Sequence, residues 1–125
     1  MAQLNQNLVI STQTELLRIP LKHILYIKGD GYCSNIHMTG GEVRQVGMNL
    51  GKIMELINGQ LYDDRQLVRP GKSLIVNLNR VYRIVVSQQL LVLADLNWNL
   101  YSVQDSREAL QALKKFIEEE SNGKR

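Results

Sequence analysis

The residues that could perform covalent chemistry in this 125-residue chain are few and scattered. Its two histidines, His23 and His37, have no obvious partners, and the adjacent carboxylates Asp63 and Asp64 fall in one polar loop. Paired catalytic carboxylates usually come from separate elements that face a cleft. The sequence also contains no HExxH, GxSxG or Walker A motif. The pattern argues against an enzyme, and we expect no cofactor and no small-molecule substrate.

Cys33 is the only cysteine, so the chain cannot form an internal disulfide. One cysteine and two histidines supply too few ligands for a structural zinc site. Lys28 lies near enough in sequence to stabilise a reactive thiolate, but a cysteine on a half-exposed strand is usually inert. No apolar run approaches the about 20 residues that span a bilayer. We therefore expect a cytoplasmic protein with no membrane partner.

The chemistry that the sequence does favour is the binding of an anionic partner. The formal net charge is +3 and the isoelectric point is about 9.1. The stretch 65–83 contains no Asp or Glu, and its basic residues are Arg65, Arg69, Lys72, Arg80 and Arg83. Such a concentration of cations can neutralise phosphates, although lysine and arginine also protect the edges of sheets.

The elements that must position these residues are mainly strands. Apolar and β-branched runs separated by Gly, Pro or polar breaks predict strands at 7–11, 13–19, 23–28, 32–38, 42–46, 66–69, 73–78, 81–86, 90–94 and 98–103. Helical spacing predicts a short helix over 49–57, with Asn49 as N-cap and Gly59 as its stop. A second helix is expected from Ser106, with Ser106 or Asp105 as its N-cap and with its charged end, 118–125, frayed. No linker or repeat divides the chain, so we expect one domain over 1–125 with a core over about 7–118.

Three blocks of sequence, taken in order, resemble the LytTR DNA-binding domain of transcriptional and response regulators. They are HILYIKGDGYCSNIHMTGGEV at 23–43, VRPGKSLIVNLNRVYRI at 68–84 and LYSVQDSREALQALKKF at 100–116. The resemblance implies a mainly β fold, an elongated arrangement of small antiparallel sheets with one short internal helix and a C-terminal helix. It also implies two-component signalling, although we expect no receiver domain within these 125 residues.

The resemblance implies that loops enter adjacent major grooves of one face of double-stranded promoter DNA. Paired direct repeats are the expected target, with a homodimer assembled on the DNA. The DNA-binding residues that it implies are Ser34, Asn35, Arg69, Lys72, Ser73, Asn77, Gln104 and Arg107. Arg69 and Lys72 would neutralise phosphates, whereas Asn35 and Gln104 have the amide geometry that pairs with adenine edges. Ser73 and Asn77 suit DNA contact and the capping of turns equally well.

Two residues at the third block motivate an alternative function. Gln104 stands where many family members have arginine, and Asp105 beside it would repel phosphate. A protein-interaction module that keeps the fold without DNA affinity is therefore the alternative. Binding of single-stranded RNA is disfavoured, because Tyr32, Tyr82 and Trp98 are not spaced as a stacking set.

Overall fold

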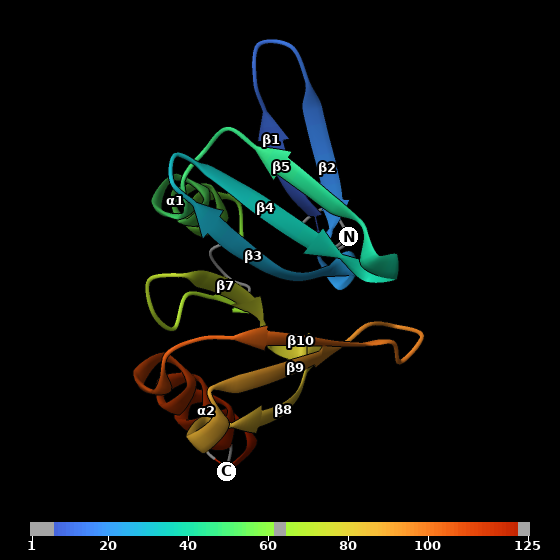
Figure 1. The fold of residues 1–125 in the computed structure, drawn as a ribbon. Coiled ribbons are helices and arrows are strands. Elements are labelled where there is room, and N and C mark those ends of the chain that lie inside the picture. The colour runs from blue at the N-terminus through green and yellow to red at the C-terminus, as the bar shows by residue number, and fades with distance from the viewer. Residues whose placement is uncertain (1–6, 62–64, 123–125) are drawn as a thin grey trace.

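The computed structural model describes residues 7–61 and 65–122, which form three antiparallel sheets and two α-helices (Figure 1). Strands β1 (Asn7–Ser11) and β2 (Leu16–Pro20) form a hairpin. The central sheet has the order β5-β4-β3-β7-β6, with β3 at Ile24–Asp30, β4 at Cys33–Met38, β5 at Val43–Val46, β6 at Leu67–Val68 and β7 at Leu74–Asn77. The third sheet has the order β10-β9-β8, with β8 at Val81–Val85, β9 at Leu90–Ala94 and β10 at Leu100–Gln104. Helix α1 spans Leu50–Gln60 and helix α2 spans Arg107–Asn122, so the predicted mainly β fold is confirmed.

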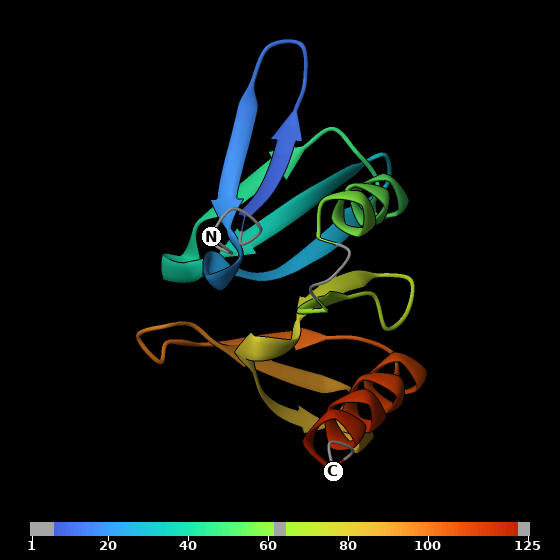
Figure 2. The same cartoon turned by 180° about the vertical axis from the view of Figure 1, so that it is seen from behind.

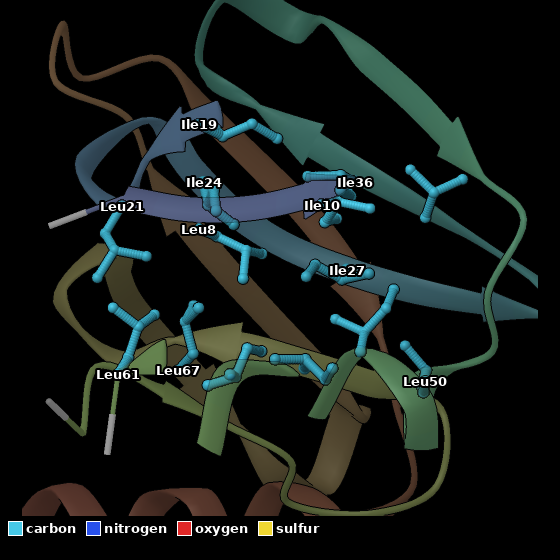
Figure 3. Close-up of a cluster of buried hydrophobic side chains, with 14 residues drawn as sticks. Leu8, Ile10, Ile19, Leu21, Ile24, Ile27, Ile36, Leu50, Leu61 and Leu67 are labelled. Carbon is cyan, nitrogen blue, oxygen red and sulfur yellow. The ribbon is translucent and has the colours of Figure 1, made fainter. Parts of the chain in front are cut away.

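The first hydrophobic core lies between the central sheet, the β1–β2 hairpin and α1 (Figure 3). Helix α1 is amphipathic because its apolar residues recur at helical spacing, and Leu50, Ile53 and Ile57 are buried. The sheet and the hairpin supply the facing side chains, which include Leu8, Ile10, Ile24, Ile27, Ile36 and Ile75.

The second core lies on the opposite face of β3 and β7, against the third sheet and α2 (Figure 2). Leu74 and Val76 of β7 point into this core, whereas Ile75 between them points into the first one. The partners across the second core are Leu91, Leu93, Val103, Leu110 and Leu113. Strands covered on both faces read as continuous apolar runs, which explains the pattern of 74–76.

Both α-helices continue past the ends that the sequence predicts. We predict that α1 stops at Gly59, but it continues to Gln60, whose side-chain amide accepts from the Val9 N–H at 2.9 Å and donates to the Val9 carbonyl at 2.8 Å. The expected fraying of 118–125 is wrong over the described part, because α2 continues to Asn122. Residues 123–125 lie outside the described residues. Within the described ranges, neither helix is long and apolar enough to cross a membrane.

The two helix N-caps follow the prediction. The Asn49 side chain accepts from the Lys52 N–H at 2.9 Å, and the Ser106 hydroxyl accepts from the Ala109 N–H at 3.1 Å. Each cap satisfies one of the N–H groups that a helix leaves unpaired in its first turn.

Asn77 is a fully buried polar residue at the end of β7. Its amide donates to the carbonyls of Leu21 at 3.0 Å and Ile24 at 2.8 Å, and its side-chain oxygen accepts from the Asn79 N–H at 3.0 Å. The amide thus ties the segment before β3 to the connection between β7 and β8. Without it, the Leu21 carbonyl would keep only the Ile24 N–H that closes the preceding turn, and the Ile24 carbonyl would lose the donor that Asn77 supplies.

We predict that Asn77→Ala lowers the free energy of unfolding by about 1–3 kcal/mol, because the carbonyls of Leu21 and Ile24 each lose the hydrogen bond from the Asn77 amide. Urea denaturation measures this change. Asn79→Ala, at the neighbouring exposed position, is the matched control and should have a small effect. Equal stabilities for the two variants would contradict the structural role of Asn77.

Asp95 is the second buried polar residue that connects segments, in the turn after β9. Its carboxylate accepts from the N–H groups of Asn97 and Asn99 at 2.9 Å and from the Tyr101 hydroxyl at 3.0 Å. It also accepts at 3.4 Å from the N–H of Gly40, which lies in the turn between β4 and β5. Burial opposes the charge, but the hydrogen bonds from Asn99, Tyr101 and Asn97 hold the pKa of Asp95 well below its usual range.

We predict that Asp95→Asn lowers the melting temperature at pH 7, because an amide cannot accept at both of these oxygen positions. A depressed pKa contributes stability above the unfolded-state value of about 3.9, and this contribution is lost as the pH falls towards the folded-state value. The difference in melting temperature between the two proteins should therefore narrow as the pH falls below about 4. Circular dichroism melts across pH 3–7 test this, and a difference that stays constant would contradict it.

Candidate nucleic-acid interface

Four segments converge on one edge of the molecule, at the left of Figure 1. They are the β3–β4 turn, the N-terminus of α1, the β6–β7 loop and the junction between β10 and α2. Two surface hollows flank the β6–β7 loop, and Lys28, Lys72 and Ser73 line both of them. The loop is therefore a ridge between two depressions.

The ridge is held on both sides by close backbone contacts. The Gly29 N–H donates to the Ser73 carbonyl at 3.1 Å, and the Arg69 guanidinium donates to the Lys72 carbonyl at 3.0 Å. A Cβ atom at Gly71 would lie 2.7 Å from the Cβ of Ala109 in α2. Only glycine allows this approach, so the ridge packs directly against the first turn of α2.

The exposed cations of the edge form no ion pairs with described residues. Lys28, Arg69 and Lys72 are exposed, and none of them forms an ion pair with a described residue. The carboxylates near them are Asp30, Asp105 and Glu108. Free cations on a projecting loop are suited to the phosphates of a nucleic-acid backbone.

The Asp105 carboxylate is turned towards the protein. Its Oδ1 accepts from the Ser106 N–H at 2.8 Å, and its Oδ2 is buried without a hydrogen-bond partner among the described residues. The expected repulsion of phosphate by Asp105 is therefore weakened by the orientation of the side chain.

Four of the residues predicted to bind DNA lie together at this edge. Arg69, Lys72 and Ser73 belong to the ridge, and Gln104 is exposed at the end of β10. Arg107 is exposed in the first turn of α2 and donates to the Ser87 carbonyl at 3.4 Å, at the border of the edge.

The structure corrects the prediction that the side chains of Ser34 and Asn77 face DNA. Both side chains are fully buried, and the Ser34 hydroxyl donates to the Met48 carbonyl at 2.7 Å. These polar groups satisfy the backbone and do not face solvent. Asn35 lies within β4, inside the predicted strand at 32–38, and is half-buried between Lys28 and Gln45.

Sequence reasoning missed three residues of the edge. Tyr32 forms the tip of the β3–β4 turn and is 91% exposed, and Lys28 lies near the end of β3. Gln89 has a left-handed backbone with a φ of 52°, and its side chain donates to the Asp105 carbonyl at 3.3 Å. The Gly-Asp-Gly turn pointed to the first two, but nothing local indicated Gln89.

The two histidines make contacts within the protein. His37 stacks on Tyr26 with ring centroids 4.2 Å apart, and burial followed by the charge of Lys28 lowers the pKa of His37. The Nδ1 atom of His23 lies 3.1 Å from the Thr39 hydroxyl oxygen, within hydrogen-bond distance. Both rings are therefore occupied by contacts within the protein.

Comparisons with known proteins identify the fold and the family of the chain. The family model of the LytTr DNA-binding domain matches residues 14–118. The solved LytTr DNA-binding domain of a Bacillus cereus protein, described as a methyl-accepting/DNA response regulator, has the same fold with a TM-score of 0.58. That match has 15% sequence identity and covers 90% of this chain and 96% of the other. No match is found among curated protein sequences. The chain therefore belongs to the LytTr DNA-binding domain family.

Proposed function

We propose that the chain is a transcriptional regulator that reads specific double-stranded promoter DNA with the ridge and the neighbouring segments of its edge. Family membership supports DNA binding in general. The observation that carries the finer proposal is the position of three unpaired cations, Lys28, Arg69 and Lys72, on and beside a ridge with fixed geometry. A preformed ridge loses little conformational entropy when it enters a groove.

The side chains of the edge divide into two roles. Lys28, Arg69, Lys72 and Arg107 neutralise phosphates, since a single point charge or guanidinium fixes the register without reading sequence. Ser73 and Gln104 read base edges, and the Gln104 amide matches the donor and acceptor pattern of adenine in the major groove. Asn35 lies farther from the tips of the loops and contributes through its neighbour Lys28.

Binding as a pair on direct repeats follows from the size of the edge. A single domain of this size contacts a short site, and affinity for a promoter rises when a second copy binds an adjacent site. We propose that the homodimer forms on the DNA, in the cytoplasm where promoter DNA is accessible.

We predict a steep dependence of affinity on salt. If Lys28, Arg69, Lys72 and Arg107 neutralise about four phosphates, the slope of log affinity against log salt concentration is about −3 to −4. Fluorescence anisotropy with promoter duplexes recovered by binding-site selection measures it. The slope should become less negative by about one unit in Arg69→Ala. It should stay unchanged in Arg44→Ala, which changes a matched exposed arginine of β5. No binding at low salt would contradict the proposal and favour the module without DNA affinity.

We also predict that Lys72 and Gln104 have separable effects. Lys72→Ala should weaken binding to all duplexes by a similar factor, because the ammonium contacts phosphate. Gln104→Ala should change the ranking of sites and cost about 1–3 kcal/mol at the matched base pair only. Binding-site selection on the three proteins separates the two effects, and the reverse pattern would overturn the assigned roles.

A further inference from the structure

A cluster of exposed apolar side chains lies far from the DNA-binding edge, at the other end of β10. Tyr82 of β8, Trp98 of the β9–β10 turn and Leu100 of β10 are 53%, 67% and 53% exposed. The rings of Tyr82 and Trp98 meet edge to face, with centroids 5.5 Å apart and planes at 88°. Tyr82 and Trp98 therefore contact each other although they are 16 positions apart in the sequence, but their perpendicular rings do not form a stacking set.

The cluster belongs to the outer face of the third sheet. Tyr101 and Val103 of β10 pack into the second core. Because side chains alternate along a strand, Leu100 and Ser102 point to the other side of the sheet. Arg83 pairs with Val92, which pairs with Ser102, so the guanidinium shares this outer face. We call Tyr82, Arg83, Trp98 and Leu100 the aromatic face.

Trp98 occupies the last position of a three-residue hairpin loop, where the turn requires a left-handed backbone and glycine is the usual residue. Its φ of 64° is the left-handed conformation, which glycine adopts freely and a bulky side chain does not. The turn is held by Asp95, whose carbonyl accepts from the Trp98 N–H at 3.0 Å and whose carboxylate binds the residues on either side. The protein thus retains an exposed indole at a position where glycine would relieve strain, as occurs at functional sites.

The charge of the aromatic face is positive only. Asp95 is the sole acidic residue of 81–104, and it is buried with its carboxylate accepting several hydrogen bonds. Arg83 is exposed and makes no ion pair among the described residues. Tryptophan, tyrosine and arginine are the residues that contribute most often to protein–protein binding energy.

We propose that the aromatic face binds an acidic segment of a protein partner, one that presents a large apolar side chain next to carboxylates. The apolar side chain packs on Trp98, Tyr82 and Leu100, while a carboxylate pairs with Arg83. A single nucleic-acid strand fits less well, because perpendicular rings cannot stack successive bases and one arginine cannot follow a backbone. Gln104 and the aromatic face occupy opposite ends of β10, so a DNA-bound protein keeps this face accessible.

The probe is a library of random 12-residue peptides without tryptophan, displayed on phage and selected on the full chain. We expect enrichment of peptides that combine Phe, Leu or Ile with Asp or Glu. Because Trp98 is the only tryptophan of the chain, its fluorescence reports binding at this face directly. Addition of a selected synthetic peptide should shift its emission to shorter wavelengths.

Matched variants test the two parts of the recognition. Trp98→Gly should lower the affinity for the labelled peptide by at least about tenfold in anisotropy titrations. Its melting temperature should be unchanged or higher, and its DNA binding should be unchanged. Arg83→Glu should lower the affinity for acidic peptides by a similar factor, whereas Arg44→Glu should not change it. Lys72→Ala, which weakens DNA binding, should leave the peptide affinity unchanged, so failure of this proposal is distinguishable from failure of the DNA-binding one.

Four results would overturn the proposal. The first is a selection without enrichment, and the second is selected peptides that bind Trp98→Gly as well as the original chain. The third is quenching of Trp98 fluorescence by an oligothymidine probe but not by peptides. The fourth is an emission shift that depends on protein concentration alone. The third would assign the face to single-stranded nucleic acid, and the fourth would assign it to a second copy of this chain.

Discussion

Burial of β3 and β7 on both faces is the constraint on which the rest of the structure depends. Ile27 and Ile75 belong to the first core, whereas Leu74 and Val76 belong to the second. The two cores therefore share one pair of strands, and neither can be displaced without exposing the other. Because β3 ends and β7 begins at the same edge, Lys28 and the ridge after β6 are held between α1 and α2. The ridge that we propose to enter DNA is thus supported by the two strands that both cores share.

Buried polar groups set how the two cores sit relative to each other. Hydrophobic packing is not directional, but the hydrogen bonds of Asn77 and Asp95 accept only one arrangement of their partners. Asn77 links the strand shared by both cores to the segment before β3, and Asp95 brings the β9–β10 turn to Gly40. The same Asp95 also supports the strained turn that displays Trp98. One carboxylate therefore contributes both to the register of the fold and to the shape of the aromatic face.

The charged and apolar groups left exposed are separated along β10. At the Gln104 end, free cations surround a ridge and the Asp105 carboxylate is turned inward. At the Leu100 end, the exposed surface is aromatic and aliphatic with a single arginine. This division suits the two proposed functions, binding of DNA at one end and of an acidic partner at the other, because the two ligands would bind to separate surfaces.

The sequence by itself determined the features that depend on neighbours along the chain. Alternating apolar residues, the turn at Gly40 and Gly41 and the caps at Asn49 and Ser106 all act over a few residues, and the structure places them as expected. Only the tertiary structure decided what residues far apart in the sequence do for each other. Gln60 at the end of α1 binds both backbone groups of Val9, and Ser34 and Asn77 are buried where they donate to distant carbonyls. Tyr82 meets Trp98 only when the third sheet forms. A polar or aromatic side chain looks the same in sequence whether it serves the core, DNA or a partner, because burial and orientation arise only when the packed elements meet.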